Sequence, residues 1–138
     1  MKSFVTGSFI IAIIILSGGV HAQTEGFQSI NANQSLARDL FRELIEINTT
    51  LNVGCTKAAE AMAVRLKAAG FAENDIRILG PAPQHMNLVV RYRGNGKLKP
   101  ILIIGHLDVV EALRQDWSFD PFKFIERDGY FYGRVRSI

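Results

Sequence analysis

The sequence predicts an α/β fold, and three observations predict it. Apolar residues recur at helical spacing in two stretches, 35–47 and 56–69. Alternating stretches typical of strands follow at 75–79 and 86–93. The four aliphatic residues 101–104 are too few for a helix and too uniformly apolar for a half-exposed strand, so they predict a strand buried on both faces. Helices followed by such strands favour an α/β sandwich.

The composition fits a single globular unit. The chain has 138 residues, 48% hydrophobic and 21% charged, which excludes intrinsic disorder and allows at most one domain. The net charge is +3, but Lys2 and Arg136 lie in terminal segments that we do not expect to belong to the domain, and the other charges are scattered. The charge therefore predicts no nucleic-acid partner. Cys55 is the single cysteine, so it cannot form an internal disulfide; it is interpreted as a buried small apolar residue, with a stray thiol as the alternative.

Residues 1–22 have the pattern of a secretory signal peptide. Lys2 supplies a positive charge, residues 9–16 are apolar, and small residues follow, with Val20 and Ala22 at the positions that a signal peptidase recognises. We expect cleavage after Ala22 and a secreted or periplasmic protein. An alternative is a membrane-anchored interaction protein that keeps its leader, but the apolar run is shorter than the ~20 residues of a bilayer span. Membrane contact is therefore expected only through the leader.

The next segments are explained by packing. Residues 23–34 are polar and predict a flexible lead-in to a helix that begins at Ser35. Thr56 is expected to cap the second helix and Gly70 to end it. The apolar residues expected to face the core are Leu36, Leu40, Phe41, Leu44, Ile45 and Ile47 in the first helix, and Ala59, Met62, Ala63 and Leu66 in the second.

A hairpin is predicted near the end of the chain. Residues 123–126 and 130–132 alternate as strands do, and Asp128-Gly129 between them favours a tight turn. The acids of the preceding loop are interpreted as solvated charges or turn caps rather than ligands; they are Glu111, Asp116 and Asp120. His85 follows two prolines and is interpreted as a turn histidine.

A histidine and an aspartate follow the apolar run. In an open α/β sheet, ligands bind at the C-terminal ends of the strands. Residues two apart in an extended segment point to the same side, so His106 and Asp108 are expected to face one space. An imidazole beside a carboxylate can be a metal ligand whose tautomer the acid fixes, or a structural polar pair. These two residues leave both interpretations open.

Residues 101–134 together resemble the opening of peptidase family M-twenty. This is the co-catalytic zinc carboxypeptidase and deacylase family, which includes glutamate carboxypeptidase, acetylornithine deacetylase and succinyl-diaminopimelate desuccinylase. The motifs that carry the resemblance are Gly105-His-Leu-Asp-Val-Val110, Trp117 with Asp120-Pro-Phe122, Glu126 with Asp128-Gly129, and Tyr132-Gly-Arg134. The helix pair and Asn87-Leu-Val-Val90 fit the same opening, so the match covers about residues 35–134.

The resemblance implies that residues 35–134 are the N-terminal part of a three-layer αβα zinc-peptidase catalytic domain. It implies hydrolysis of an amide or peptide bond in a peptide or an N-acyl amino acid. It also implies two metal ions, usually zinc with cobalt or manganese as alternatives, that activate a bridging water. His106 matches the family's first metal ligand, and Asp108 matches the acid that holds this imidazole and is needed for activity. Loop packing is the expected role of Trp117, Pro121 and Phe122.

The sequence departs from the family after Arg134. The family continues with a glycine and, shortly after, an aspartate that bridges the two metals, whereas this chain continues Val135-Arg-Ser-Ile138. Loss of one base from codons for Arg-Gly-Ala-Phe-Asp would give this ending, so residues 135–138 are expected to be an out-of-frame tail. One family ligand cannot hold two metals, and we expect no peptidase activity from this chain by itself. The alternative function is a non-catalytic, small exported α/β remnant or binding protein.

Overall fold

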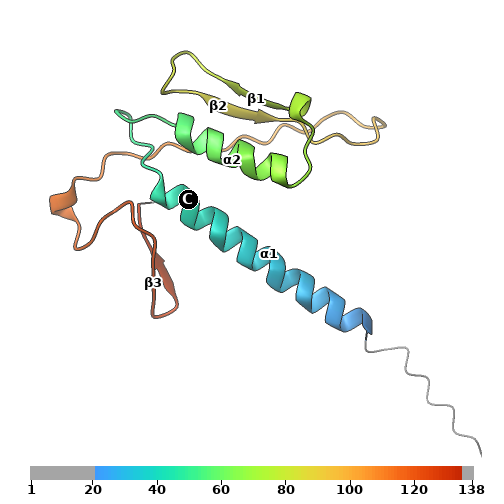
Figure 1. Cartoon of the computed structure of the whole chain (residues 1–138), viewed down its shortest axis with the longest axis horizontal. Helices are drawn as coiled ribbons and strands as arrows, with labels where there is room; N and C mark the ends of the chain where they lie inside the picture. Colours follow the sequence, from blue (N-terminus) through green and yellow to red (C-terminus); the bar gives the residue numbers. More distant parts are fainter. Residues whose placement is uncertain (1–20, 135–138) are drawn as a thin grey trace, which may run out of the picture. The chain divides into compact units, whose positions relative to one another are not determined.

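A computed structural model describes the backbone of residues 21–134 and side chains from residue 31 (Figure 1). Most of the predicted signal peptide and the predicted tail at 135–138 lie outside these residues. The chain divides after Ala37 into two units. In chain order the elements are α1 (His21–Glu46), α2 (Thr56–Ala68), the 3₁₀ turn η1 (Glu73–Asp75), β1 (Ile76–Leu79), β2 (Asn87–Val90), the 3₁₀ turn η2 (Arg114–Asp116), β3 (Ile125–Arg127) and β4 (Tyr130–Tyr132).

Helix α1 begins earlier than the sequence pattern predicts. It starts at His21 rather than Ser35, so residues 23–34, expected to form a flexible lead-in, are helical. No proline interrupts residues 21–46, so no residue there blocks a continuous helix, although Gly26, Asn31 and Asn33 have low helix propensity. Only the C-terminal part of that stripe is well covered: Ile45 is 3% exposed, whereas Leu36 is 51% exposed. After the helix, Thr49 and Thr50 are buried, and the Asn48 side chain accepts a hydrogen bond from the Thr50 amide.

Helix α2 has the predicted bounds, but Thr56 does not cap it. The Thr56 hydroxyl donates to the Pro83 carbonyl at 2.7 Å and accepts from the Met86 amide at 3.1 Å, so it fastens the helix start to the loop before β2. The end of the helix confirms the prediction for Gly70, which has φ +89°. The Gly70 amide donates a hydrogen bond to the Lys67 carbonyl, and the Phe71 amide donates one to the Leu66 carbonyl. These two bonds form a Schellman motif at the end of the helix.

The first sheet is the antiparallel pair β1–β2. Ile76 lies opposite Val90, and Ile78 lies opposite Leu88. Side chains alternate across a strand, so these four residues share one face, and all four are buried or half-buried. Helix α2 packs against both strands and brings its own buried residues, Ala58, Ala59 and Ala63. The two predicted strands therefore pair with each other, and helix α2 packs against them.

The second sheet is the predicted hairpin β3–β4. Its turn residues Asp128 and Gly129 have φ of 55° and 78°, the left-handed pair that a two-residue hairpin turn requires. The hairpin carries an aromatic cluster onto the C-terminal part of α1. Phe124 packs edge to face on Phe41, with ring centroids 6.1 Å apart, and lies 5.1 Å from the Phe131 ring. Such pairs add roughly 0.5–1.5 kcal/mol each beyond the area that they bury.

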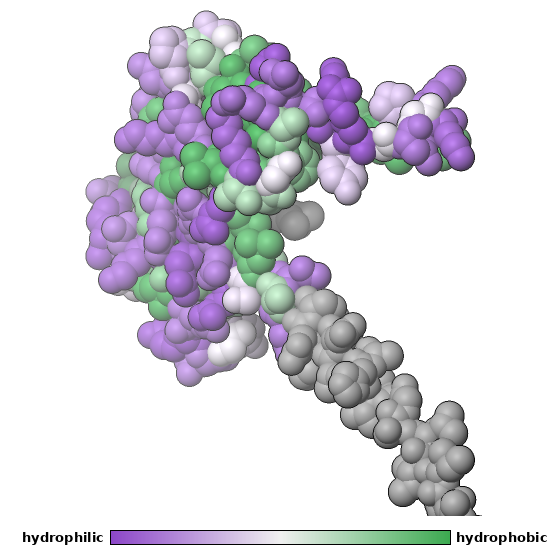
Figure 2. All heavy atoms as spheres, turned by 45° about the vertical axis from the view of Figure 1, so that its right-hand side comes forward, coloured by the Kyte–Doolittle hydropathy of each residue, from purple (hydrophilic) through white to green (hydrophobic). Residues whose placement is uncertain are grey.

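The predicted strand at 101–104 is absent, and this prediction is wrong. Within residues 21–134, no strand includes or pairs with Ile101–Ile104, and these four side chains are 82–89% exposed. A strand buried on both faces needs a hydrogen-bonded neighbour and covering layers. Here β1 and β2 pair only with each other, and α2 covers their shared face. Figure 2 shows hydrophobic side chains open at the surface among hydrophilic ones.

The α/β prediction is confirmed at the level of a small mixed fold. In the part of the chain that the structure describes, two helices accompany two separate two-stranded antiparallel sheets. No helix within this part is long and apolar enough to cross a membrane.

Candidate functional site

His106 and Asp108 contact each other in the exposed segment that follows residue 104. The imidazole Nδ1 lies 2.9 Å from a carboxylate oxygen of Asp108 and 3.0 Å from the Asp108 backbone carbonyl oxygen. A carbonyl oxygen can only accept, so Nδ1 carries the hydrogen and donates to both oxygens. The two side chains therefore face the same space, as their spacing predicts, although they do not stand at the end of a strand.

The residues after His106 are tied to the loop that follows α1. The Thr49 hydroxyl donates to the Leu107 carbonyl at 2.7 Å, and the Val109 amide donates to the Thr49 carbonyl at 3.3 Å. Thr49 is 2% exposed, which makes it a fixed anchor. Sequence reasoning missed this role because a threonine at a helix end has the same pattern as a capping residue.

Two of the family-like motifs meet beside this segment. The guanidinium of Arg134 donates from Nε to the Val110 carbonyl at 3.1 Å, and the Arg134 amide donates to the Pro121 carbonyl. The motif that contains His106 and the motif that ends at Arg134 are therefore joined, although 24 positions separate Arg134 from Val110.

Cys55 lies near enough to Asp108 for the two groups to affect each other. Partial burial raises the pKa of the Cys55 thiol above its ordinary value, and the negative charge of Asp108 raises it further. Both effects favour the neutral thiol. The residue is half-buried, whereas the sequence indicated a buried position. We therefore assign the Cys55 thiol no role other than that of a neutral group near the Asp108 carboxylate.

The other residues considered as ligands have structural partners. Glu111 accepts a hydrogen bond from the Asn52 side chain at 3.3 Å, and Asp120 accepts one from the Phe122 amide at 2.9 Å. The His85 amide donates to the Ala82 carbonyl, which confirms its place in a turn. Across residues 21–134, no group of three or more His, Cys, Asp or Glu side chains is placed to hold a metal ion. The donors fit one zinc ligand with its orienting acid, and not a complete zinc site.

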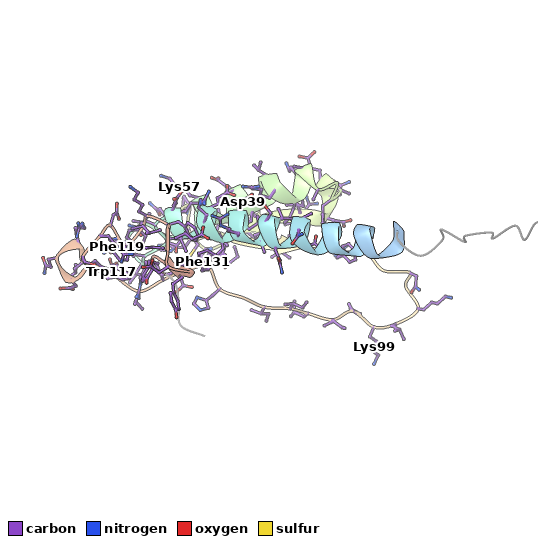
Figure 3. The ribbon with its side chains drawn as sticks, turned by 90° about the horizontal axis from the view of Figure 1, so that it is seen from below. Asp39, Lys57, Lys99, Trp117, Phe119 and Phe131 are labelled. Carbon is purple, nitrogen blue, oxygen red and sulfur yellow. The ribbon has the colours of Figure 1, made fainter. Side chains whose placement is uncertain are left out.

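Loop packing is observed for Trp117, as predicted. The Trp117 ring packs edge to face on Phe119 at 5.7 Å, and Phe119 packs on Tyr132 at 6.2 Å. Pro121 is buried and Phe122 is half-buried. Figure 3 labels Trp117, Phe119 and Phe131, which gather at one end of the ribbon.

A separate hollow of about 370 Å³ lies between the end of α1 and helix α2. It contains neither His106 nor Asp108. Its walls carry acids and bases that partly pair, with Arg65 bonded to Glu43 at 2.8 Å. The residues that line it are Asp39, Arg42, Glu43, Glu46, Ile47 and Arg65. The candidate site is therefore the exposed His106–Asp108 pair and not this hollow.

Sequence comparison identifies relatives for parts of the chain. Aminoacylase-1 of Sus scrofa is 35% identical over 98 residues, which make up 69% of this chain and 23% of that relative. Acetylornithine deacetylase of Pasteurella multocida (strain Pm70) is 40% identical over 75 residues, 54% of this chain and 19% of that protein. The N-fatty-acyl-amino acid synthase/hydrolase of Homo sapiens is 49% identical over 37 residues, 27% of this chain and 7% of that protein.

The chain spans less than a quarter of the length of these relatives. No family model and no solved structure matches it. One of these relatives, acetylornithine deacetylase, has the name of a family member that the sequence motifs resemble. The resemblance of this chain to peptidase family M-twenty is therefore confirmed by its relatives.

Proposed function

We propose that this chain carries the opening part of a metal-dependent hydrolase that cleaves amide or peptide bonds. The observation that carries the proposal is the 2.9 Å contact between His106 Nδ1 and the Asp108 carboxylate, inside the motif that resembles the family. The names of the relatives, aminoacylase-1 and acetylornithine deacetylase, support the same reaction class. The substrate class is a peptide or an N-acyl amino acid, and the complete domain is a three-layer αβα sandwich.

In this proposal His106 is a ligand of one of two zinc ions, with cobalt or manganese as alternatives. Asp108 is a positioning residue. Its carboxylate accepts the hydrogen bond of Nδ1, and in this tautomer Nε2 is the nitrogen that would hold a metal. A metal pair, when bound, would supply an activated water and polarise the scissile carbonyl. Both residues are exposed, with side chains 41% and 64% accessible.

We also propose that the 138-residue polypeptide does not hydrolyse amides by itself. Zinc sites take three or four protein ligands, and His106 supplies one. The purified chain with added zinc should therefore release no amino acid from N-acetyl substrates. Zinc-dependent hydrolysis that disappears in His106→Ala would contradict this part of the proposal.

A chimera tests the function directly. The 75-residue segment of the Pasteurella multocida acetylornithine deacetylase that matches this chain is replaced by the corresponding residues of this chain. We expect the chimera to bind zinc and to deacetylate acetylornithine, and we expect His106→Ala in the chimera to lose both. His85→Ala is the matched control, because His85 lies in a turn, and it should keep both properties.

Circular dichroism of each chimera separates a lost site from a lost fold. A folded chimera in which His106→Ala binds zinc and turns over as the parent does would overturn the assignment of His106. A folded Asp108→Asn chimera should keep part of its zinc and lose most of its turnover, because the imidazole keeps its nitrogen but loses its orientation. Second-sphere changes of this kind typically cost about 10- to 100-fold.

Export is proposed on the leader pattern of residues 1–22. Expression in a bacterium followed by fractionation should give a mature protein that begins at Gln23. A protein that keeps its leader and stays with the membrane would favour the anchored alternative instead.

A further inference from the structure

The peptide that carries His106 and Asp108 is held by Thr49. The Thr49 hydroxyl donates to the Leu107 carbonyl at 2.7 Å, and the Thr49 carbonyl accepts from the Val109 amide at 3.3 Å. These bonds lie one residue before and one residue after Asp108. In the part of the chain that the structure describes, no other hydrogen bond joins the backbone of Leu107, Asp108 or Val109 to another segment. Because no helix or strand includes this peptide, Thr49 fixes its direction around the acid.

The two oxygens that accept the imidazole hydrogen both belong to Asp108. His106 Nδ1 lies 2.9 Å from the Asp108 carboxylate and 3.0 Å from its backbone carbonyl. In an extended segment, the backbone groups of neighbouring residues point to opposite edges. Leu107 and Val109 turn theirs toward Thr49, and Asp108 between them turns its carbonyl toward the imidazole. The orientation of both acceptors therefore depends on the two bonds to Thr49.

Thr49 is suited to this role because it is buried in a loop with its own hydrogen bonds. Its side chain belongs to a residue that is 2% exposed. The Asn48 side chain accepts from the Thr50 amide at 3.0 Å, and the Thr50 carbonyl accepts from the Gly54 amide at 2.8 Å. A buried hydroxyl that loses its partner costs free energy, so the bond from Thr49 to the Leu107 carbonyl is maintained. Thr49 is outside the motifs that resemble the family.

We propose that Thr49 is a positioning residue for His106. By holding the peptide on both sides of Asp108, it keeps the hydrogen of the neutral imidazole on Nδ1, so that Nε2 is the nitrogen that would bind a metal. Thr49 acts through the backbone of Leu107 and Val109 and is not itself a ligand in this proposal. The position of the hydrogen depends only on contacts within this chain, whereas its value for metal binding rests on the proposed function.

The first test measures the tautomer of His106 without any metal. Nitrogen-15 NMR of the full-length chain, at a pH where the imidazole is neutral, distinguishes the Nδ1–H form from the Nε2–H form, and His106→Ala identifies the signals. The parent should hold mainly the Nδ1–H form. Thr49→Val replaces the hydroxyl by a methyl group and should shift the ratio of the two forms toward Nε2–H by about three- to tenfold, the effect of one hydrogen bond. Thr49→Ser keeps the donor and should keep the ratio of the parent.

Thr50→Val is the matched control for this test. Thr50 is also 2% exposed, and its hydrogen bonds are made by its backbone, so the same loss of a hydroxyl should leave the tautomer unchanged. Circular dichroism shows which variants keep their helices, and Thr49→Ala takes the place of Thr49→Val if the latter does not fold. A parent that holds mainly the Nε2–H form overturns the proposal. A folded Thr49→Val with the ratio of the parent, or an equal shift in Thr50→Val, also overturns it.

The second test measures zinc binding in a hydrolase chimera that includes residues 35–134 of this chain. Only the Nδ1–H form can bind zinc through Nε2, so Thr49→Val should raise the zinc dissociation constant by the factor by which the fraction of that form falls. Thr49→Ser should bind zinc as the parent chimera does. An unchanged dissociation constant in a folded Thr49→Val chimera overturns the positioning role. A parent chimera that binds no zinc contradicts the proposed function instead, and the tautomer measurement then decides the role of Thr49.

Discussion

The β1–β2 sheet and the segment 101–104 have similar aliphatic composition and opposite fates. Ile76 is 7% exposed in the sheet, whereas Ile103 is 89% exposed in the coil. Strand β1 finds its partner β2 a few residues away in the sequence and is covered by α2, which comes just before it. Segment 101–104 has no such neighbour within residues 21–134. Apolar sequence therefore becomes a buried strand only where partners lie within reach.

The largest expected contrast comes from the same substitution at a buried isoleucine of helix α1 and at an exposed isoleucine of segment 101–104. Ile45→Ala removes a side chain that is 3% exposed and should lower the free energy of unfolding by about 3–4 kcal/mol, because a cavity remains beside the hairpin. Ile103→Ala removes one that is 89% exposed and should change it by less than about 0.5 kcal/mol. Urea unfolding followed by circular dichroism measures both. Equal losses would show that segment 101–104 is packed in solution.

A second contrast concerns glycines with the same backbone geometry. Gly54 and Gly70 have φ of 85° and 89°, so alanine at either position costs about 1 kcal/mol for a left-handed residue. An added methyl at Gly54 also overlaps the Gln84 carbonyl, whereas at Gly70 it meets nothing. We expect Gly54→Ala to cost about 3 kcal/mol in total, with roughly 2 of these from the overlap.

The Gly70→Ala variant is the control, because it has the cost of the left-handed backbone without the overlap. Urea unfolding measures the free energy of unfolding of both variants. If both substitutions cost the same, the loop at Gln84 yields to the methyl group, and the contact between the start of α2 and this loop is softer than the structure indicates.

The smallest contrast is confined to acid. Arg93 donates two hydrogen bonds of 2.7 Å to the buried Asp75 carboxylate, and this lowers the pKa of the carboxyl below its ordinary value, against a smaller opposing effect of burial. In the unfolded chain the carboxyl regains its ordinary, higher pKa. The stabilisation is therefore complete above that ordinary value and is lost as the pH falls through the lowered pKa of the folded chain.

Urea midpoints at a series of acidic pH values test this. The parent chain should lose stability on acidification, and Asp75→Asn should lose less, because it has no proton to take up. Asp116→Asn, in the exposed turn η2, is the matched control and should keep the slope of the parent. An Asp75→Asn variant with an unchanged slope would place the acid sensitivity elsewhere.

Local signals were sufficient for most elements of the fold. Asp128-Gly129 predicted the hairpin turn, and Gly70 predicted the end of α2, because both depend on the backbone of a few adjacent residues. The spacing of His106 and Asp108 predicted their contact for the same reason. Thr56 could not be assigned from its neighbours, because its partners Pro83 and Met86 lie 27 and 30 positions away.

By itself, the sequence determined the second helix, the C-terminal part of the first, the strands β1 and β2, the β3–β4 hairpin, the contact of His106 with Asp108 and the resemblance to a deacylase family. Each of these rests on residues close together in the chain or on the order of short motifs. Tertiary structure decided which apolar residues are buried, which threonines anchor loops and where the Arg134 motif meets the segment of His106. Burial requires partners on both sides of an element, and a segment's own residues cannot specify whether those partners are present.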